Sequence, residues 1–470
     1  YVLVNSLALF TKNVKEDSMK KIIAMLLSVL MLGSLLAGCG EKPEQEDPST
    51  AEGKKEITMW FWGTSDYQRT AMEKYLVEGF NASQDEYTLS VEYRASVDND
   101  ITVALSGGGG PDIIYGSGPA FVAGYAAQGL LLNLDSYSQQ YGWKDRLVDA
   151  YYDLCTTNGS LYSLPGALSG IGVFYNAKLL EDNGWAVPTT YDELVAVMDQ
   201  AIAKGLHGGI IGAKDWRYTN DWPVSMLFAS VAGPEAVYKC LTGEQKWNSP
   251  EITEATEELV KWYNAGYFGG EDYWNVDANE SCQMLLDGGT PFFFAPLNGF
   301  QWLKNVATSE EQLADIGFMP MPSKNSDSPA VMLGSVCTFS INAKSENPDG
   351  AAAVMDYMMT ADFASSMSAE WPGYWGLPLK DLTSMDTSAF TGLSVQYMKA
   401  CADTIDALNS GSFGYMASGC FPAVTYETCI DIDTVWLGSQ SVSDFLDAMD
   451  AAYAEDVAAG SVIPVPQPTF

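Results

Sequence analysis

An alternation of short apolar strands with amphipathic helices limits this chain to a small set of folds. The apolar segment 57–62 is predicted to be a strand, and a helix that starts from Thr64-Ser65-Asp66 follows it to Phe80. The same alternation then occurs twice more, with strands at 87–93 and 112–115 and helices at 98–105 and 119–128. Because a strand–helix–strand connection of this length joins parallel strands, we expect an α/β fold in which helices cover both faces of a parallel sheet.

The carboxyl ends of these strands are the expected place for a ligand, since ligands of such sheets bind just beyond them. In this chain those ends are 62–66 (WGTSD), 93–96 (YRAS) and 115–117 (YGS). Trp62 ends the first strand and shares a face with Trp60, so Trp62 is the candidate for ligand contact and Trp60 is assigned to the core. Ser117 is a second candidate. Asp66 is a third, although a role in capping the helix explains this residue equally well.

The glycine run 107–110 suggests a phosphate-binding loop but lacks the required context. It has no Gly-Lys-Ser/Thr ending, and it precedes a strand rather than following one. We therefore expect a loop that closes the helix before it.

Residues 19–39 have the organisation of an export signal. Lys20 and Lys21 follow Met19, an apolar run extends from 22 to 32, and small residues lead to Cys39. The run is short for a bilayer span, although a transmembrane anchor over 26–36 stays an alternative. The ending Leu-Ala-Gly-Cys resembles the bacterial lipobox, which implies cleavage before Cys39 and a diacylglyceryl anchor on its thiol.

The segments around this signal are not expected to join the folded body. Residues 1–18 precede the first Met and are expected to be an upstream translated extension, and 19–38 form the lipoprotein signal peptide. The stretch 39–55 begins with the lipidated Cys39, is rich in Glu, Pro, Ser and Lys, and is predicted to be a flexible stalk. The body should therefore lie at the extracellular face of the bacterial cytoplasmic membrane, tethered by lipid.

The charge balance is strongly acidic and excludes some partners. The chain has 60 Asp and Glu against 24 Lys and Arg among 470 residues, a formal net charge of −36. Residues 1–39 hold four of the bases and two of the acids, which leaves 58 acids against 20 bases in the exported part. A binder of nucleic acid needs a basic face, so that class is excluded, and docking on anionic lipid is disfavoured. The hydrophobic content of 47% suffices for a large core.

Cysteine and histidine are too scattered for a metal site or an activated nucleophile. Apart from Cys39, seven cysteines occur without a Cys-x-x-Cys pair, and a Cys420–Cys429 bridge and reduced, buried thiols are both compatible with this spacing. His207 is the only histidine and lies in the glycine-rich stretch 205–209. A zinc site needs further ligands, and a Ser-His-Asp triad would depend on this one loop residue, so we expect no metal and no cofactor.

A series of short motifs follows one another over about residues 56–460. They are 109–114 (GGPDII), 128–135 (QGLLLNLD), 161–165 (LYSLP), 172–178 (GVFYNAK), 188–194 (PTTYDEL), 316–322 (IGFMPMP), 333–335 (LGS) and 441–446 (SVSDFL). Each motif is weak alone. Together, in this order and behind a lipobox, they resemble family 1 of the extracellular solute-binding proteins, the lipoproteins that capture substrates for ABC importers.

The resemblance implies a periplasmic-binding-protein-like type II fold, in which two α/β lobes close on a ligand about a hinge. The order of the motifs assigns 56–164 plus 333–385 to lobe 1 and 165–332 plus 386–470 to lobe 2. The chain would cross between the lobes near Pro165-Gly166 and Gly334-Ser335, where glycine can absorb the backbone change of closure. The resemblance also implies the permease subunits of an ABC importer as partners. No feature of the sequence indicates oligomers, so a monomer is expected.

The residues expected to bind the ligand are those suited to a sugar, which offers apolar C–H faces and a rim of hydroxyls. Trp216 and Trp222 lie in a polar stretch without periodicity, and the turn 370–376 (EWPGYWG) holds three aromatics. The resemblance places a ligand-facing loop at Asn298. It places Ser335 at the hinge, and Ser335 is a candidate for this reason. The candidate ligand-binding residues are therefore Trp62, Asp66, Ser117, Trp216, Trp222, Asn298, Ser335, Trp371, Tyr374 and Trp375.

Two other functions stay open at this point. An acidic cleft with aromatic walls would also suit a cationic solute such as a polyamine, through charge pairing and cation–π contact. An exported glycoside hydrolase would need two carboxylates at a fixed separation, and no local acid–base motif stands out among the 60 acids. We therefore expect a binding protein without catalytic activity, and an oligosaccharide as its ligand.

Overall fold

The computed structural model describes residues 53–214, 216–335 and 337–469, and every element below belongs to the compact unit Lys54–Phe470. The expected extension 1–18, the signal peptide 19–38, Cys39 and the stalk as far as residue 52 lie outside the described residues. The last residues of the predicted stalk differ from the expectation. Lys55 is the first residue of strand β1 (Lys55–Trp62), and the Lys54 ammonium donates hydrogen bonds to the carbonyls of Asn81 and Gln84 at 3.0 and 2.7 Å.

The larger sheet has five strands in the order β2-β1-β3-β11-β6. These are β1, β2 (Tyr87–Arg94), β3 (Ile113–Gly116), β6 (Leu164–Pro165) and β11 (Thr338–Ile341). β1 runs parallel to β2, from Lys55↔Tyr87 to Trp62↔Arg94, and parallel to β3. The three strands predicted from the alternation are therefore parallel, as expected, but the sheet is not parallel throughout, because β11 pairs antiparallel to both β3 and β6. β11 begins opposite Gly116, the last residue of β3. The chain re-enters the sheet at this end of β3 after a long segment outside the sheet, and β11 therefore runs back along β3.

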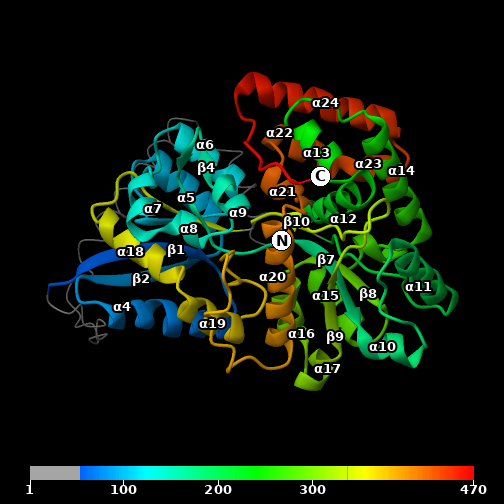
Figure 1. Ribbon diagram of the computed structural model, residues 1–470, viewed down its shortest axis with the longest axis horizontal. Coiled ribbons are helices and arrows are strands. Elements are labelled where there is room, and N and C mark those ends of the chain that lie inside the picture. Colours follow the sequence, from blue (N-terminus) through cyan, green and yellow to red (C-terminus); the bar gives the residue numbers. More distant parts are fainter. Residues whose placement is uncertain (1–52, 215, 336, 470) are drawn as a thin grey trace, which may run out of the picture. The chain divides into compact units, whose positions relative to one another are not determined.

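Helices cover both faces of this sheet, as the strand–helix alternation predicted. The first helical stretch continues through α3 (Asp66–Ala71), the π-helical segment η1 (Met72–Glu78) and α4 (Gly79–Ser83). It starts where Gln68 Oε1 accepts the backbone N–H of Ser65 at 2.9 Å, as in a capping box. Further helices of this part include α5 (Val97–Ser106), α6 (Pro119–Ala127), α7 (Asp135–Tyr141), α8 (Trp143–Arg146), α18 (Pro348–Met358) and α19 (Ala361–Glu370). Figure 1 shows β1 and β2 between α4 on one side and α18 on the other.

The glycine run after α5 ends this helix, as expected. Gly107 is its C-cap, and the N–H groups of Gly107 and Gly109 bond to the carbonyls of Val103 and Ala104, each at 3.0 Å. Both N–H groups are therefore used to close the helix and are not available to bind a phosphate.

A second sheet has the order β8-β7-β9, with every neighbouring pair antiparallel. Its strands are β7 (Ile171–Asn176), β8 (Phe292–Pro296) and β9 (Ile316–Pro320). Around it lie long helices that include α11 (Tyr191–Ala203), α14 (Pro250–Ala265), α15 (Ala278–Leu286), α20 (Leu393–Asn409) and α24 (Val442–Ala459). Two of the family-like motifs start helices here: Thr190 caps α11, and the Ser441 hydroxyl accepts the Asp444 N–H at the start of α24.

Each sheet has its own hydrophobic core. The first core gathers residues such as Phe61, Ile113, Phe339 and Trp375 around the five-stranded sheet. The second gathers Phe174, Phe294, Trp262 and many others around the three-stranded sheet. Two cores with separate sheets define two lobes, each of α/β construction; we call them lobe 1 and lobe 2 in that order.

The chain crosses between the two cores in paired segments. β6 pairs with β11 through Thr338↔Pro165, and Ser169 forms a bridge with Gly334. The Tyr151 hydroxyl lies 2.6 Å from the Gly334 carbonyl and 2.9 Å from that of Ser169, so it ties the two segments together. A Cβ atom on Gly334 would lie 2.7 Å from the Met416 side chain. Glycine at Gly334 is therefore required by close packing.

The described cysteines, Cys155, Cys240, Cys282, Cys337, Cys401, Cys420 and Cys429, are all buried and free, so Cys420 and Cys429 are not bridged. His207 Nε2 lies 3.4 Å from Asp272 Oδ2. Within residues 53–214, 216–335 and 337–469, no group of three or more His, Cys, Asp or Glu could hold a metal ion. The same residues include no helix long and apolar enough to cross a membrane.

Candidate functional site

A cavity of about 720 Å³ lies between groups from the two lobes. Nine of its lining residues are aromatic: Trp62, Tyr115, Phe121, Trp216, Tyr218, Trp222, Tyr374, Phe421 and Tyr426. Six more are polar or acidic: Ser117, Asp221, Asn298, Gln301, Ser418 and Glu427. The cavity therefore combines flat apolar surfaces with a limited number of hydrogen-bonding groups, which is the usual composition of a site for a small organic ligand.

The lobe 1 wall is built on the carboxyl ends of β1 and β3, where the sequence predicted it. Burial alternates along β1, so that Phe61 lies in the core while Trp62 is only half-buried. The Trp62 indole N–H donates to the Tyr374 hydroxyl at 3.0 Å, which fixes both rings at the cavity. Burial raises the pKa of both Tyr115 and Tyr374, so their hydroxyls stay protonated. Ser117 is exposed and donates to Asp98 Oδ1 at 2.8 Å.

Trp60, which the sequence assigned to the core, is only half-buried. The guanidinium of Arg94 covers its ring at 3.6 Å from the centroid. Trp60 therefore packs against the lobe 1 core on one side and lies under a cation on the other, so the assignment to the core is wrong in this detail.

The lobe 2 wall contains the most exposed aromatic rings of the cavity. Trp216 and Tyr218 keep 47% and 45% of their surface exposed, which is unusual for large rings outside a binding surface. Trp222 is buried and stacks on Trp302, with ring centroids 5.5 Å apart. Tyr218 lies nearly parallel to Tyr426, with an interplanar angle of 14° and centroids 6.2 Å apart. These rings present flat faces of the kind that pack against sugar C–H groups.

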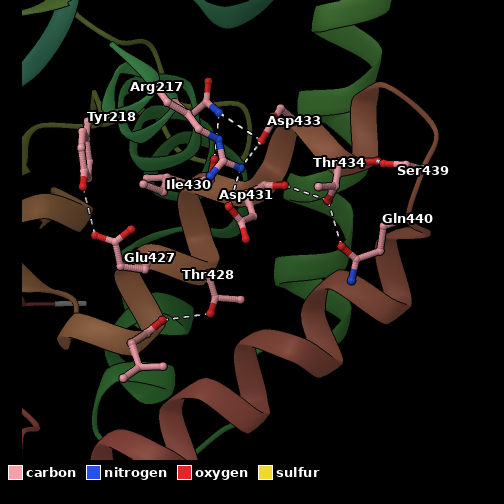
Figure 2. A network of polar contacts seen from close by, with 12 residues as sticks. Arg217, Tyr218, Glu427, Thr428, Ile430, Asp431, Asp433, Thr434, Ser439 and Gln440 are labelled. Atoms are coloured by element: carbon pink, nitrogen blue, oxygen red, sulfur yellow. Dashed lines mark hydrogen bonds and ion pairs between the residues drawn. The ribbon is translucent and has the colours of Figure 1, made fainter. Parts of the chain in front are cut away.

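An ion-pair network holds this wall in place (Figure 2). Arg217 follows Trp216 and pairs with both Asp431 and Asp433, the latter at 2.7 Å. Next to it in the chain, the Tyr218 hydroxyl makes a long hydrogen bond of 3.5 Å to Glu427 Oε1. The network thus connects the 216–222 segment to the helix that supplies Tyr426 and Glu427 and to Asp431 and Asp433, which follow this helix in the chain.

Asp221 is the buried acid of the cavity. Its Oδ1 accepts the Ser225 hydroxyl at 2.5 Å, and its Oδ2 accepts the Ser418 N–H at 3.4 Å. Burial raises the pKa of Asp221, although these hydrogen bonds act in the opposite direction. Its two oxygens are therefore used mainly within the protein.

Asn298 has an acceptor without a partner. Its Oδ1 is buried and makes no hydrogen bond, although Asn298 lines the cavity at the start of α16 (Gly299–Val306) and makes no side-chain cap there. An unpaired buried carbonyl costs about 1–3 kcal/mol, so a donor on a ligand would remove a penalty that the protein alone retains.

Six of the ten sequence-predicted ligand residues line the cavity: Trp62, Ser117, Trp216, Trp222, Asn298 and Tyr374. Trp371 and Trp375 do not line it, and both are fully buried. Trp375 stacks between Phe61 and Phe339, at 6.1 and 6.0 Å, in the core below the cavity. The aromatic density of the 370–376 turn therefore serves packing, and only Tyr374 reaches the cavity.

Asp66 and Ser335 also lie away from the lining residues. Asp66 is exposed in the first turn of α3, where an acid favours the helix start. The buried Ser335 hydroxyl donates to the Cys337 carbonyl at 2.7 Å, within the crossing segment. Its partner is the backbone of the hinge, which explains why it does not line the cavity.

Sequence reasoning missed several lining residues as named candidates, above all Gln301, Phe421, Tyr426 and Glu427. Tyr426 and Glu427 lie on the short helix α22 (Ala423–Cys429), whose sequence has no pattern that indicates a site. Tyr218 and Asp221 could have been found, because they belong to the same polar segment as Trp216 and Trp222.

Two α/β lobes that enclose an aromatic and polar cavity define a two-lobe solute-binding protein of the type II periplasmic-binding-protein fold. The family model described as bacterial extracellular solute-binding protein matches residues 65–364, and the chain belongs to this family. The membership confirms the resemblance that the ordered motifs indicated.

Known proteins similar to this chain fit the same class. An uncharacterized ABC transporter extracellular-binding protein of Pyrococcus horikoshii is 23% identical over 65% of this chain and 71% of its own length. The maltotriose-binding protein of Pyrococcus abyssi is 23% identical over 53% of this chain and 49% of its own length, so the match spans about half of that relative. A solved chitin oligosaccharide binding protein has a TM-score of 0.70, with 18% identity over 86% of this chain and 99% of that one, which supports the fold.

Proposed function

We propose that this protein captures a carbohydrate, and specifically an oligosaccharide, between its two lobes and delivers it to the permease of an ABC importer. The observation that carries the proposal is the cavity itself, which is lined both by exposed rings such as Trp216 and by Asn298, whose Oδ1 has no partner in the protein. Rings suit the apolar faces of a sugar, and a free carbonyl oxygen suits a hydroxyl donor. The volume of about 720 Å³ falls in the usual range of about 300–1,000 Å³ for ligand sites.

The names of similar proteins support the same ligand class. The Pyrococcus abyssi relative is named as a binder of maltotriose, and the solved neighbour as a binder of chitin oligosaccharides. Their sugars differ, so the proposal for this chain extends to an oligosaccharide and not to one particular sugar.

We further propose the lobes as 56–164 plus 333–385 and 165–332 plus 386–470, closing about the segments at Pro165-Gly166 and Gly334-Ser335. The two hydrophobic cores support this division over most of the chain. The exceptions lie near the crossing segments, where, for example, Tyr151 and Leu154 belong to the lobe 2 core and Ala167 belongs to the lobe 1 core. Cys39 would provide the lipid anchor at the extracellular face of the membrane, and the protein would act as a monomer. Two acyl chains on one cysteine are enough for stable anchoring.

We propose that the protein is not an enzyme. A glycoside hydrolase needs two carboxyl groups that both face one glycosidic bond. Asp221 is occupied by Ser225 and Ser418, which leaves Glu427 as the one carboxylate with a free oxygen among the described residues that line the cavity.

A cationic solute such as a polyamine is the second candidate. The observation in its favour is that both charged residues in the described part of the cavity lining, Asp221 and Glu427, are acids. A thermal-shift screen with saccharides, polyamines and amino acids separates the candidates, because a ligand at 100 times its Kd adds about 2.7 kcal/mol to the free energy of unfolding. A shift with spermidine and with no saccharide would reject the carbohydrate proposal.

A further inference from the structure

The charged residues among the described lining of the cavity are acids. Among the described residues that line it, Asp221 and Glu427 are charged, and neither a lysine nor an arginine is present. A ligand inside the cavity therefore meets negative groups without a compensating protein cation in the lining.

Of these two acids, Glu427 is the one available to a ligand. Asp221 is 2% exposed and its oxygens accept hydrogen bonds from Ser225 and Ser418. Glu427 is exposed, and its contact is the long 3.5 Å hydrogen bond from Tyr218 to Oε1. Its second oxygen is free, and the first is only weakly held.

The nearest arginine of this wall does not neutralise Glu427. Arg217 lies beside Tyr218 in the chain, but its guanidinium is shared between Asp431 and Asp433 (Figure 2). Two acids against one base leave this network negative as well. An anionic ligand would therefore meet repulsion from Glu427 and from the wall behind it.

The rings around Glu427 favour a positive group at the same place. Tyr218 and Tyr426 also line the cavity, and their faces are nearly parallel, with an interplanar angle of 14°. The faces of tyrosine rings attract ammonium groups, and a neighbouring carboxylate adds charge pairing to this attraction. An amine-bearing ligand would thus find both contacts within one short helix and the segment that faces it.

We infer that Glu427 determines the charge specificity of the site: it favours saccharides that carry a protonated amine and rejects saccharides that carry a carboxylate. Neutral saccharides bind through the rings and Asn298, and Glu427 accepts a hydroxyl from them. This inference rests on the proposed carbohydrate function and narrows the class of saccharide.

The test compares three forms of the same di- and trisaccharides, over several linkages: neutral, 2-amino-2-deoxy and uronate. Calorimetric titration of the purified protein at pH 6 gives the Kd of each form. We expect the amino form of a bound saccharide to bind at least tenfold more tightly than its uronate form. This preference should shrink as salt rises from 50 to 500 mM, because the Debye length falls from about 14 to about 4 Å.

The substitution Glu427→Gln keeps the size and the hydrogen-bonding atoms of the side chain but removes the charge. In this variant the amino-to-uronate ratio should fall at least fivefold, while the Kd of the neutral form stays within threefold. Glu257→Gln is the matched control, because Glu257 is exposed on α14 and does not line the cavity. This control should keep the wild-type ratio.

Two results would overturn the inference. If the uronate form bound as tightly as the amino form, or if Glu427→Gln left the ratio unchanged, Glu427 would not set the charge specificity, although the carbohydrate function would stand. If no form of any saccharide bound, the carbohydrate function and this inference would fail together.

Discussion

Trp371 donates its indole N–H to Oε1 of Gln301 at 2.8 Å, although the two residues belong to different lobes. Trp371 is part of the lobe 1 core, whereas Gln301 lies on α16, whose Phe300 and Leu303 belong to the lobe 2 core. Gln68 of lobe 1 donates to the same oxygen at 3.0 Å. One buried side-chain oxygen therefore joins the lobes beside the cavity that Gln301 also lines.

Replacement of Gln301 should loosen this junction. Gln301→Ala leaves the Trp371 donor unpaired and the Gln68 amide with a long 3.5 Å contact to the Tyr67 hydroxyl, and a buried unpaired donor costs about 1–3 kcal/mol. We expect a lower melting temperature, a larger radius of gyration of the ligand-free protein in X-ray scattering, and at least threefold weaker ligand binding. Gln283→Ala is the control, because Gln283 is half-buried on α15 and its amide donates to Asp287 of the same lobe at 2.9 Å. An unchanged radius together with unchanged affinity would show that this contact does not hold the lobes together.

Trp216 and Trp375 should respond to alanine in opposite ways. Trp216 is 47% exposed at the cavity, so Trp216→Ala should weaken saccharide binding at least tenfold and change the free energy of unfolding by less than about 1 kcal/mol. Trp375 is fully buried, so Trp375→Ala should cost about 3–5 kcal/mol of stability. Urea denaturation and calorimetric titration measure the two effects. Equal loss of stability in both variants would contradict the placement of Trp216.

Asn298→Ala should lower the affinity for the ligand without lowering the stability of the protein. The substitution removes an acceptor that has no partner in the protein, so the free energy of unfolding should stay constant or rise while ligand affinity falls. Asn220 is the contrasting variant, because its amide donates to the Ile430 carbonyl and its carbonyl accepts the Tyr273 hydroxyl. Asn220→Ala should lower the melting temperature clearly. If Asn298→Ala lowered it as much, the Oδ1 of Asn298 would have a structural partner.

The raised pKa of Asp221 predicts that the free energy of unfolding depends on pH. Burial raises its pKa in the folded protein above the value of about 3.9 in the unfolded chain, so the unfolded chain releases this proton first as the pH rises. The contribution of Asp221 to stability should therefore fall from about pH 4 upward, until the pH passes the folded pKa. Urea midpoints between pH 4 and 8 should show Asp221→Asn gaining stability relative to wild type over this interval. A constant difference between the two proteins would contradict the raised pKa.

Features that depend on neighbouring residues could be predicted from the sequence, whereas features that depend on residues far apart in the chain could not. β1, β2, α5 and α6 lie within two residues of their predicted bounds, because their periodicity depends on neighbouring residues. The antiparallel direction of β11 could not be predicted in this way, since it depends on where the chain returns more than 200 residues after β3. The resemblance to a family supplied long-range information about the two lobes, but not about the direction of this strand.

The same distinction applies to the cavity. The place of Trp62 at the end of its strand predicted ligand contact, and Trp62 lines the cavity, whereas Trp60 was wrongly assigned to the core that Phe61 occupies. The 370–376 turn is equally aromatic, but only the folded chain shows that Phe61 and Phe339 enclose Trp375. No local sequence pattern identifies Glu427. Its proposed role depends on its place in the cavity and on the absence of a lysine or arginine among the described lining residues.

The most direct test of the carbohydrate proposal is calorimetric titration of the purified protein with neutral di- and trisaccharides, with spermidine in parallel. We predict that at least one saccharide binds with 1:1 stoichiometry and a micromolar or lower Kd, and that Trp216→Ala and Asn298→Ala each weaken this binding at least tenfold. Binding of spermidine with no binding of any saccharide would contradict the proposal.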